Sequence, residues 1–593
     1  MSGNSKVHQR RFYKPRPALV FINIFSILII SAGAHAGLSG PLHGVLGPGV
    51  YQVTGDITVE TGSSLTILPP SDFLFNYGLG FEIDGLLTAA GTEADSIRFL
   101  RAAGGEWNLV HFLDALVDTS RLEYCRISGC RYGGVFCNNS NLIISHCTIN
   151  NNEGSLGAAI RCHLAHITIR DSDLMNNVST HMSGTGGVLL NASVGIVEGC
   201  RILNNTGGMV GMGGGVKCFD SVVAIRNCQI EGNTGLGGGG GLYIGTCIGA
   251  RVEDCNINGN LSGGGGGVYA YNCNDLLIER CRISGNQAHV GAGIRLFNSE
   301  LGIARSSIDG NRATSRLLEA GAGGGIFATD STALALTHCT ISRNIAEPWE
   351  SIPPKGAGLY FFYLDSTIVN TNLINCIVEG NEGGGGLYFE DSTAVIDVSY
   401  NDFWNNEGGD FAGVSVDPQL GIITGGNAND DPCDLYFNIF ENPRFVDPES
   451  GNFNLLHQSP AIDAGDPGFP HDPDGTIADQ GAFWFNQAAG SIPAPFDGMA
   501  RRASIKIWPN PFSTRADIQF SFESFQNSAG QLGIYNVQGR LILELPPLSR
   551  SAGLYEYSWD GRDGAGKKVC DGVYFVRGSW GQRSAGQKVL YLR

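Results

Sequence analysis

The chain lacks the hydrophobic pattern of helices over most of its 593 residues. No stretch between residues 101 and 412 shows the 3.6-residue period of an amphipathic helix, and Gly and Asn are too frequent there for stable helices. This absence excludes a predominantly helical enzyme. The 86 Gly residues suit a chain that turns often and tightly.

A zinc motif is also missing, because the 16 Cys residues include no Cys-x-x-Cys pair and the 12 His residues do not cluster. A disulfide framework is the alternative interpretation of Cys in an exported chain. However, all except Cys130, Cys162, Cys433 and Cys570 sit at or near repeated positions where a small apolar side chain would fill a core. Stacked parallel Cys neighbours have poor dihedral angles for a disulfide. We therefore expect mostly free, buried thiols.

Only one long apolar run occurs. Residues 18–30 are largely apolar, follow five basic residues and precede Ala34-His35-Ala36, which is the pattern of a cleaved secretory signal over residues 1–36. An uncleaved membrane anchor is the alternative, but a spanning helix needs roughly 20 apolar residues. We expect cleavage and no transmembrane span in the mature chain.

Positive charge is scarce as well, with 38 Lys and Arg against 56 Asp and Glu and a net charge of −18. Loss of residues 1–36, which contain five basic and no acidic residues, would lower the net charge by five, to −23. This excess argues against nucleic acid and anionic membrane surfaces as partners. To a lesser degree it argues against tight binding of acidic polysaccharide, unless bound cations intervene.

What the sequence does contain is an internal repeat, Cys-x-Ile, followed in most copies by x-x-Asn. Copies start at Cys125, Cys147, Cys200, Cys228, Cys255, Cys281, Cys339 and, with Val in place of Ile, Cys376, and altered copies start at Ser172, Ser306 and Asn401. Successive copies are 22 to 37 residues apart. A period of this size indicates a solenoid whose coils stack on one another.

Each coil is expected to contain three short strands that pair in parallel with their copies one coil on, about 4.8 Å away. Cys and Ile of the motif are two residues apart, so both point to the same side of a strand. Equivalent residues then form ladders. Besides the Cys ladder, we expect one at Ser140, Ser193, Ser221, Cys247, Cys273, Ser299, Ser331, Ser366 and Ser392. A third runs through Asn152, Asn177, Asn205, Asn233, Asn260, Asn286, Asn311, Asn344, Asn381 and Asn406, where Asn tolerates the turn and its amide bonds to its copies.

This pattern resembles the right-handed parallel β-helix family, broadly the pectate-lyase-like solenoids. The combination of Gly-Gly-Val segments, as at 214–216, with Cys-x-Ile-x-x-Asn is also similar to the repeats of chlamydial polymorphic outer-membrane proteins. We expect an all-β chain with a right-handed parallel β-helix and a small C-terminal β-sandwich. The expected parts are a signal (1–36), capping coils (37–100), repeats (101–412), a closing segment (413–485), a linker (486–503) and an immunoglobulin-like module (504–593).

The C-terminal module contains alternating short strands with Trp559-Asp560-Gly561 and Gly572-Val573-Tyr574. These residues resemble the sorting domain of the bacterial type IX secretion system and the immunoglobulin-like domain of the flagellar hook-capping protein. The resemblance implies that secretion machinery recognises residues 504–593 and that the protein is secreted or held at the outer-membrane surface.

Catalysis on the solenoid would need acids and bases on neighbouring coils. Asp171 and Asp173 lie together, but neither has a carboxylate on the next coil in its column, and a solvated strand face explains them equally well. They are weak catalytic candidates.

Ligand binding has its best candidates in a column of aromatic residues after Gly-Gly-Val and in an insertion between residues 345 and 356. These residues are Tyr243, Tyr269, Phe327, Tyr360 and Tyr388 in the column and Trp349 in the insertion. The alternative is that the column packs beneath the Gly-rich loops or stacks on itself.

A metal is considered only in the closing segment. The carboxylates of Asp472, Asp474 and Asp479 are suitable Ca²⁺ ligands, although Asp-Pro-Asp-Gly is equally consistent with a simple turn and the spacing is not that of an EF-hand. No other cofactor is expected. We interpret the chain as an adhesin-like module that binds carbohydrate or a cell surface, with a polysaccharide lyase or glycoside hydrolase as the alternative.

Overall fold

The computed structural model describes residues 37–114, 118–362, 371–390, 396–487, 504–508, 512–522, 530–536, 540–548, 553–580 and 583–591. The expected signal and most of the expected linker lie outside them. The chain divides into two compact units: residues up to 422 except 374–377 and 399–402, and those two segments with residues 423–593. Within the described parts, no helix is long and apolar enough to cross a membrane.

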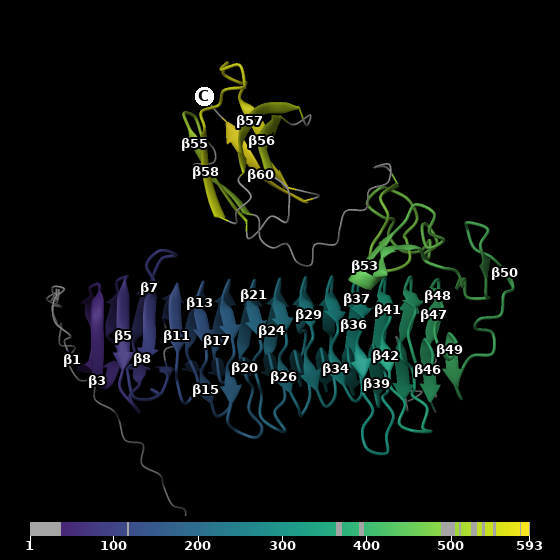
Figure 1. Ribbon diagram of the computed structural model, residues 1–593, viewed down its shortest axis with the longest axis horizontal. Helices are drawn as coiled ribbons and strands as arrows, with labels where there is room; N and C mark the ends of the chain where they lie inside the picture. The colour runs from purple at the N-terminus through teal and green to yellow at the C-terminus, as the bar shows by residue number, and fades with distance from the viewer. Residues whose placement is uncertain are drawn as a thin grey trace, which may run out of the picture. The chain divides into compact units, whose positions relative to one another are not determined.

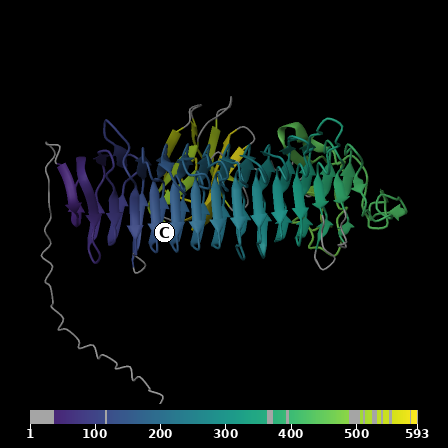
Figure 2. The same ribbon diagram turned by 90° about the horizontal axis from the view of Figure 1, so that it is seen from below.

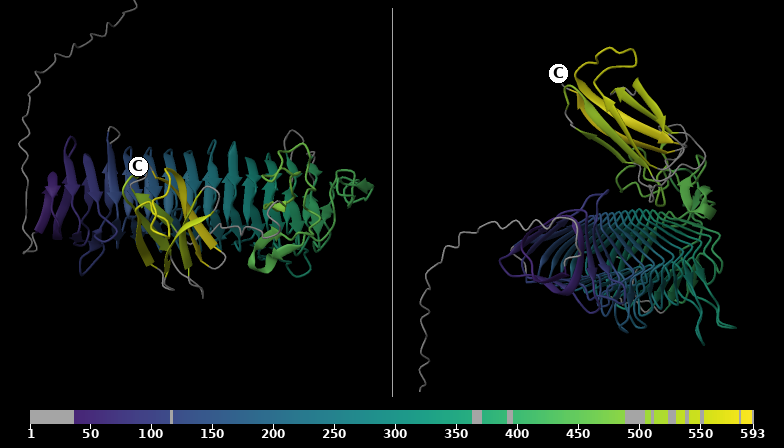
Figure 3. Two further views of the ribbon diagram at one scale, coloured as in Figure 1. Left: turned by 90° about the horizontal axis from the view of Figure 1, so that it is seen from above. Right: turned by 60° about the vertical axis from the view of Figure 1, so that its left-hand side comes forward.

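The first unit is a parallel β-solenoid, as the repeat predicts. Its strands lie side by side as successive rungs in sequence order (Figures 1 and 2), and its coils follow one behind another (Figure 3). It begins with β1 (Gly37–Pro41) and the long β3 (Gly49–Val59), which pairs with the first strands of two different faces.

Three faces surround the core. The motif face contains β5 (Ser71–Phe75), β8 (Ile97–Arg101), β11 (Cys125–Ser128), β14 (Thr148–Asn150), β18 (Asp173–Met175), β22 (Arg201–Leu203), β25 (Gln229–Glu231), β29 (Asn256–Asn258), β33 (Arg282–Ser284), β37 (Ser307–Asp309), β41 (Thr340–Ser342), β45 (Ile377–Glu379) and β48 (Asp402–Trp404). The aromatic face contains β6 (Phe81–Ile83), β9 (Val110–Leu113), β12 (Val135–Asn138), β16 (Ile160–His163), β20 (Val188–Asn191), β23 (Val216–Phe219), β27 (Leu242–Gly245), β31 (Val268–Tyr271), β35 (Ile294–Phe297), β39 (Ile326–Thr329), β43 (Leu359–Phe362), β46 (Leu387–Glu390) and β49 (Phe411–Gly413).

The third face is a 14-stranded sheet. Its strands are β2 (Gly44–Leu46), β4 (Ser64–Ile67), β7 (Leu86–Ala90), β10 (Thr119–Glu123), β13 (Asn141–Ser145), β17 (His166–Arg170), β21 (Val194–Glu198), β24 (Val222–Arg226), β28 (Arg251–Glu253), β32 (Leu276–Glu279), β36 (Glu300–Ala304), β40 (Ala333–Thr337), β44 (Asn372–Ile374) and β47 (Asp397–Ser399). Two-residue strands follow the Asn ladder: β15 (Glu153–Gly154), β19 (Val178–Ser179), β26 (Thr234–Gly235), β30 (Leu261–Ser262), β34 (Gln287–Ala288), β38 (Arg312–Ala313) and β42 (Ile345–Ala346).

The corners between faces share one backbone device. In one coil, Asn227, Gly232 and Thr246 have φ of 51°, 64° and 50°, and each immediately precedes a buried ladder residue. The left-handed residue bends the chain so that the next, extended residue points into the core. The positive φ therefore falls one position before the ladder Asn, and not on it as the sequence suggested.

The Asn ladder is confirmed, with Asn260 as a representative. Its Nδ2 donates to the carbonyl of Ile230 at 2.9 Å and to Oδ1 of Asn286 at 3.0 Å. Its Oδ1 accepts from the backbone N–H and Nδ2 of Asn233, at 2.9 and 3.0 Å. The same bonds recur from Asn152 to Asn406, so the amides form a continuous buried line.

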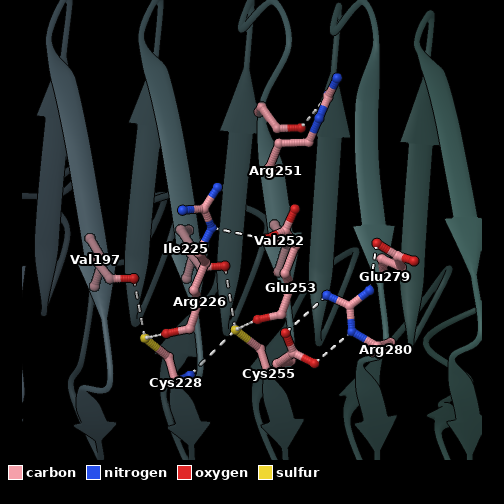
Figure 4. Close-up of polar contacts among 12 residues, drawn as sticks. Val197, Ile225, Arg226, Cys228, Arg251, Val252, Glu253, Cys255, Glu279 and Arg280 are labelled. Carbon is pink, nitrogen blue, oxygen red and sulfur yellow. Dashed lines mark hydrogen bonds and ion pairs between the residues drawn. The ribbon is translucent and has the colours of Figure 1, made fainter.

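The Cys ladder is also hydrogen-bonded from rung to rung (Figure 4). The Cys228 N–H donates to Sγ of Cys255 at 3.5 Å, and the Cys255 thiol donates to the carbonyls of Ile225 and Glu253 at 3.6 and 3.2 Å. Burial raises the pKa of the Cys255 thiol, which keeps it protonated. All 16 Cys lie in the described parts of the chain and are outside disulfides, and all except Cys570 are buried, as expected for mostly buried thiols.

Three ladder assignments need correction. Cys162 is a ladder residue, because it pairs in register with Cys137 on the aromatic face. Cys130 occupies the first place of the Asn ladder, where its N–H donates to Oδ1 of Asn152 at 3.1 Å. Thr332 replaces Ser331 in the second ladder, because one extra residue precedes it and shifts the buried position.

The second unit contains a closing segment and a β-sandwich. The closing segment has β50 (Gly425–Gly426), β51 (Pro432–Cys433), β52 (Phe445–Asp447), the 3₁₀ turn η1 (Pro448–Ser450) and β53 (Asn452–Leu455). The sandwich has a three-stranded antiparallel sheet of β54 (Ser504–Trp508), β55 (Ala516–Phe522) and β58 (Gly553–Trp559). Its four-stranded sheet contains β56 (Gly530–Asn536), β57 (Leu541–Leu548), β59 (Gly572–Trp580) and β60 (Arg583–Tyr591). Phe512, Trp559 and Tyr591 form the centre of its buried core, as the alternating pattern predicts.

Candidate functional site: the outer faces of the solenoid

The two catalytic candidates lie on the solvent side of the motif face. Asp173 forms a two-point ion pair with Arg201 one rung on, at 2.7 and 2.6 Å. Asp171 occupies a corner position with φ of 46°, and its backbone N–H donates to the carbonyl of Glu198. The Arg201 pair gives Asp173 a structural role. Their catalytic role stays a prediction.

Ion pairs between neighbouring rungs are a general feature of these faces. Arg226 Nε lies 2.8 Å from Glu253 (Figure 4), and Arg280 Nε lies 2.8 Å from Asp254. Because the side chains of these pairs are partly exposed to solvent, each pair contributes about 1 kcal/mol or less. Their main consequence is that these carboxylates already contact a cation. The sequence alone does not show this contact and would allow them as catalytic candidates.

One pair differs because its acid is buried. Asp309 is only 6% exposed, and Arg282 contacts it at 2.8 Å. Burial raises the pKa of Asp309 although Arg282 opposes the rise. Replacing Arg282 by Met should lower the free energy of unfolding by about 3 kcal/mol at pH 7.5. Because the pKa of Asp309 is higher in the folded state than in the unfolded state, the ionised carboxylate destabilises the fold. This destabilisation is absent below the ordinary pKa of Asp and grows as pH rises through the pKa of folded Asp309.

Urea unfolding at pH 7.5 and 4.0 tests this prediction. The loss for R282M should shrink at pH 4.0, where Asp309 takes up a proton. R201M is the matched control, since Asp173 is more exposed, and it should cost less than about 1 kcal/mol at both pH values. Equal losses for the two variants would contradict the prediction.

The predicted binding column is largely covered. Tyr243, Tyr269, Phe327 and Tyr360 are between 3% and 7% exposed. Their rings meet edge to face, with centroids 5.4 Å apart for Tyr243 and Tyr269 and 5.1 Å apart for Phe327 and Tyr360. A Cβ added to Gly238 would lie 2.5 Å from the Tyr269 ring, so a Gly-rich loop lies directly over it. These four rings therefore pack beneath the loops and against one another, which is the alternative to ligand binding that the sequence left open.

Tyr388 and Trp349 remain half-buried and accessible. Trp349 sits in a short hairpin closed by two backbone hydrogen bonds to Ile352, at 3.1 and 2.7 Å. Beside Tyr388, Lys355 forms a 2.5 Å ion pair with Glu390 and lies 5.7 Å from the Tyr388 ring. Of the six predicted binding residues, these two offer a ligand the most surface.

The charge on the aromatic face is one-sided. Side chains alternate along each strand, so the second and fourth residues of its four-residue strands face outward. From β9 to β43 none of these positions is Asp or Glu, whereas they include Arg161, Lys217 and Arg295. Outward carboxylates stand near the two ends of this face, Glu82 on β6 and Glu390 on β46. The sequence shows these cations, but it does not reveal which of them lack an acidic partner.

The three calcium candidates in the closing segment use their oxygens within the protein. Asp472 accepts from the N–H of Asp479 at 2.8 Å, and Asp474 accepts from the Thr476 hydroxyl at 2.8 Å. Asp479 accepts from the N–H groups of Asp463 and Phe485 at 2.8 and 2.5 Å, although burial raises its pKa to about 7. No group of three or more His, Cys, Asp or Glu among the described residues is arranged to hold a metal ion. These contacts fit the turn alternative, and calcium stays a prediction.

Comparison with known families matches both units. Residues 115–260, 158–319 and 240–428 match the family described as "Right handed beta helix region", and these overlapping matches span more than half of the chain. Residues 512–578 match the FlgD Ig-like domain. No curated protein matches the chain.

Solved structures with a similar chain path include the A-module of a mannuronan C-5 epimerase from Azotobacter vinelandii. The two sequences are 15% identical, the match covers 64% of this chain and 87% of that chain, and the TM-score is 0.31. A periplasmic alginate epimerase shows 11% identity, coverage of 62% and 78%, and a TM-score of 0.30. A surface adhesin of Streptococcus pneumoniae shows 14% identity, coverage of 68% and 87%, and a TM-score of 0.25.

Proposed function

The chain belongs to the right-handed β-helix family, and from this membership we propose that its solenoid is a glycan-binding module of an exported, surface-associated protein. The observation that carries the proposal is the aromatic face, where accessible rings such as Tyr388 and Phe219 accompany the cations, and where the outward strand positions from β9 to β43 hold no carboxylate. Sugars stack on rings and hydrogen-bond to charged groups, so a face of this composition suits them.

Binding without cleavage fits the described acids better than catalysis does. A glycoside hydrolase needs two carboxyl groups within several ångströms of each other and of the substrate. Asp173 is engaged by Arg201, and Glu390 is held by Lys355 and the Tyr360 hydroxyl. Burial would raise the pKa of Glu390, but these two partners lower it overall, which favours a permanently ionised group over a proton donor.

We extend the proposal to the C-terminal sandwich, which would direct export and attachment at the outer-membrane surface through secretion machinery. Its support is the antiparallel two-sheet architecture and the match of residues 512–578 to an immunoglobulin-like domain.

The test mixes the full chain with neutral and acidic polysaccharides, with and without Ca²⁺, and follows co-sedimentation and new reducing or unsaturated ends. We expect binding without new ends. Tyr388→Ala and Trp349→Ala should each weaken binding about fivefold, as loss of one ring contact does. Trp404→Ala is the control, because Trp404 is 38% exposed on the motif face and should not matter. New chain ends, or binding to none of the glycans, would overturn the proposal.

A further inference from the structure

A cavity of about 230 Å³ opens on the aromatic face over β16, β20 and β23. Five consecutive rungs place Phe136, Arg161, Leu189, Lys217 and Tyr243 in one column. The two cations are thus two rungs apart, about 10 Å at ordinary strand spacing. The shorter Leu189 between them leaves the hollow.

Aromatic rings hold the two cations from outside the cavity. The Arg161 guanidinium lies 4.4 Å from the Phe136 ring, and the Lys217 ammonium lies 5.6 Å from the Tyr243 ring. Each ring belongs to the rung beyond its cation, so the arrangement is ring, cation, Leu189, cation, ring. Cation–ring contacts fix both charges without neutralising them.

Polar groups complete the wall on one side. His163 and Asn191 occupy the neighbouring outward positions on β16 and β20, and Asn191 Nδ2 lies 3.0 Å from His163 Nδ1. Phe219, which is 37% exposed, forms the rim on β23. The cavity therefore combines two positive charges, a polar pair and an exposed ring.

Neither cation has an acidic partner within 4 Å in the described parts of the chain. Lys355, the other Lys on the solenoid, shows the contrast, because Glu390 lies 2.5 Å from its ammonium. Burial lowers the pKa of both Arg161 and Lys217. Two partly desolvated, uncompensated charges are unusual in a chain with a net charge of −18, since such charges ordinarily recruit a counter-ion.

We propose that this cavity binds an anionic group of a sugar, a carboxylate or a sulfate, between Arg161 and Lys217. The inference rests on the proposed glycan-binding function and names its ligand class. The positive charges lie along one short column, so they suit one or two anionic groups of an extended chain. The negative net charge opposes a nucleic acid, with a phosphate at every nucleotide, more strongly than a glycan that places one or two anionic groups in the cavity.

The experiment titrates the full chain with three hexasaccharides by calorimetry. Hyaluronan carries carboxylates, chondroitin sulfate carries carboxylates and sulfates, and carboxyl-reduced hyaluronan is the neutral match. We expect the anionic oligomers to bind at least tenfold more tightly than the neutral one, as expected for charge-assisted hydrogen bonds. The tighter of the two anionic oligomers identifies the preferred group.

Arg161→Gln and Lys217→Gln should each weaken anionic binding about tenfold and leave neutral binding unchanged. Arg201→Gln is the matched control, because Arg201 is an Arg on the motif face that is already paired with Asp173. The preference for anionic oligomers should also fall as salt rises. Thermal unfolding verifies that each variant is folded.

The outcomes separate the two proposals. Equal binding of anionic and neutral oligomers would overturn the anion site but leave the glycan-binding function standing. Full anionic binding by a folded variant that combines Arg161→Gln and Lys217→Gln would have the same consequence. Tighter binding of a single-stranded oligothymidylate than of any sugar would overturn the ligand class. Binding to no glycan, here or in the wider polysaccharide panel, would overturn both.

Discussion

Replacement of Asn260 by Ala should lower the free energy of unfolding by about 4 kcal/mol, which is among the largest effects expected of one substitution. The Asn260 amide is fully buried and makes four hydrogen bonds. Its loss leaves the backbone N–H and one amide proton of Asn233 buried without partners, and it removes one donor from the carbonyl of Ile230. Each such group costs about 1–3 kcal/mol, partly offset by relaxation.

Equilibrium urea unfolding, followed by circular dichroism, measures this loss. Asn274→Ala provides the control, because Asn274 is exposed on the same solenoid, and it should change stability by less than about 0.5 kcal/mol. A loss below about 1 kcal/mol for N260A would show that water or a shifted neighbour satisfies these groups, contrary to the prediction.

Replacement of Gly241 by Ala should cost about 3 kcal/mol. A Cβ at this position would lie 2.7 Å from the carbonyl oxygen of Gly267, 2.9 Å from Cγ2 of Ile257 and 3.0 Å from Nδ2 of Asn260. The nearest of these atoms belongs to the backbone of the next rung, which cannot move without breaking its own ladder bonds. The clash, rather than backbone conformation, therefore makes Gly necessary here.

The shift of the unfolding midpoint in urea gives the size of this effect. Gly47→Ala is the matched control, because a Cβ at Gly47 meets nothing within 4 Å. G47A should leave stability unchanged or raise it slightly by restricting the unfolded chain. Similar stabilities for G241A and G47A would contradict the close backbone approach.

The repeat predicts much of the fold because each copy has the same environment above and below. The Asn ladder follows directly from this periodicity, and so do the free thiols at positions such as Cys228 and Cys255. Periodicity predicts less well where one residue is inserted, so Ser331 was expected in a place that Thr332 occupies. It also does not show which residue of a corner takes the left-handed conformation.

The candidate site was harder to predict because it depends on contacts between side chains. The spacing of Tyr243 and Tyr269 indicates a column, but their burial depends on Gly-rich loops folding over them. The same holds for charge: Asp173 and Lys217 both occupy outward positions, and only the structure shows that Asp173 has a cationic partner. The cavity between Arg161 and Lys217 could not be predicted from the sequence, because it depends on how side chains from three neighbouring strands lie in space.

The Asn ladder also gives the solenoid an electrical direction. Each ladder amide donates one Nδ2 proton to a carbonyl one coil back and the other to the Asn on its C-terminal side. The last amide has no further Asn in the line, and Asn406 Nδ2 donates instead to the carboxylate of Asp410 at 2.8 Å. In the second unit, Asn438 likewise ends its own short series by donating to Asp434 at 3.1 Å. A line of aligned dipoles gains most from a negative charge at its donating end. Coils within the Asn ladder are therefore interchangeable, whereas the last coil is not. The number of coils can vary only on the N-terminal side of Asp410, the anion that ends the ladder.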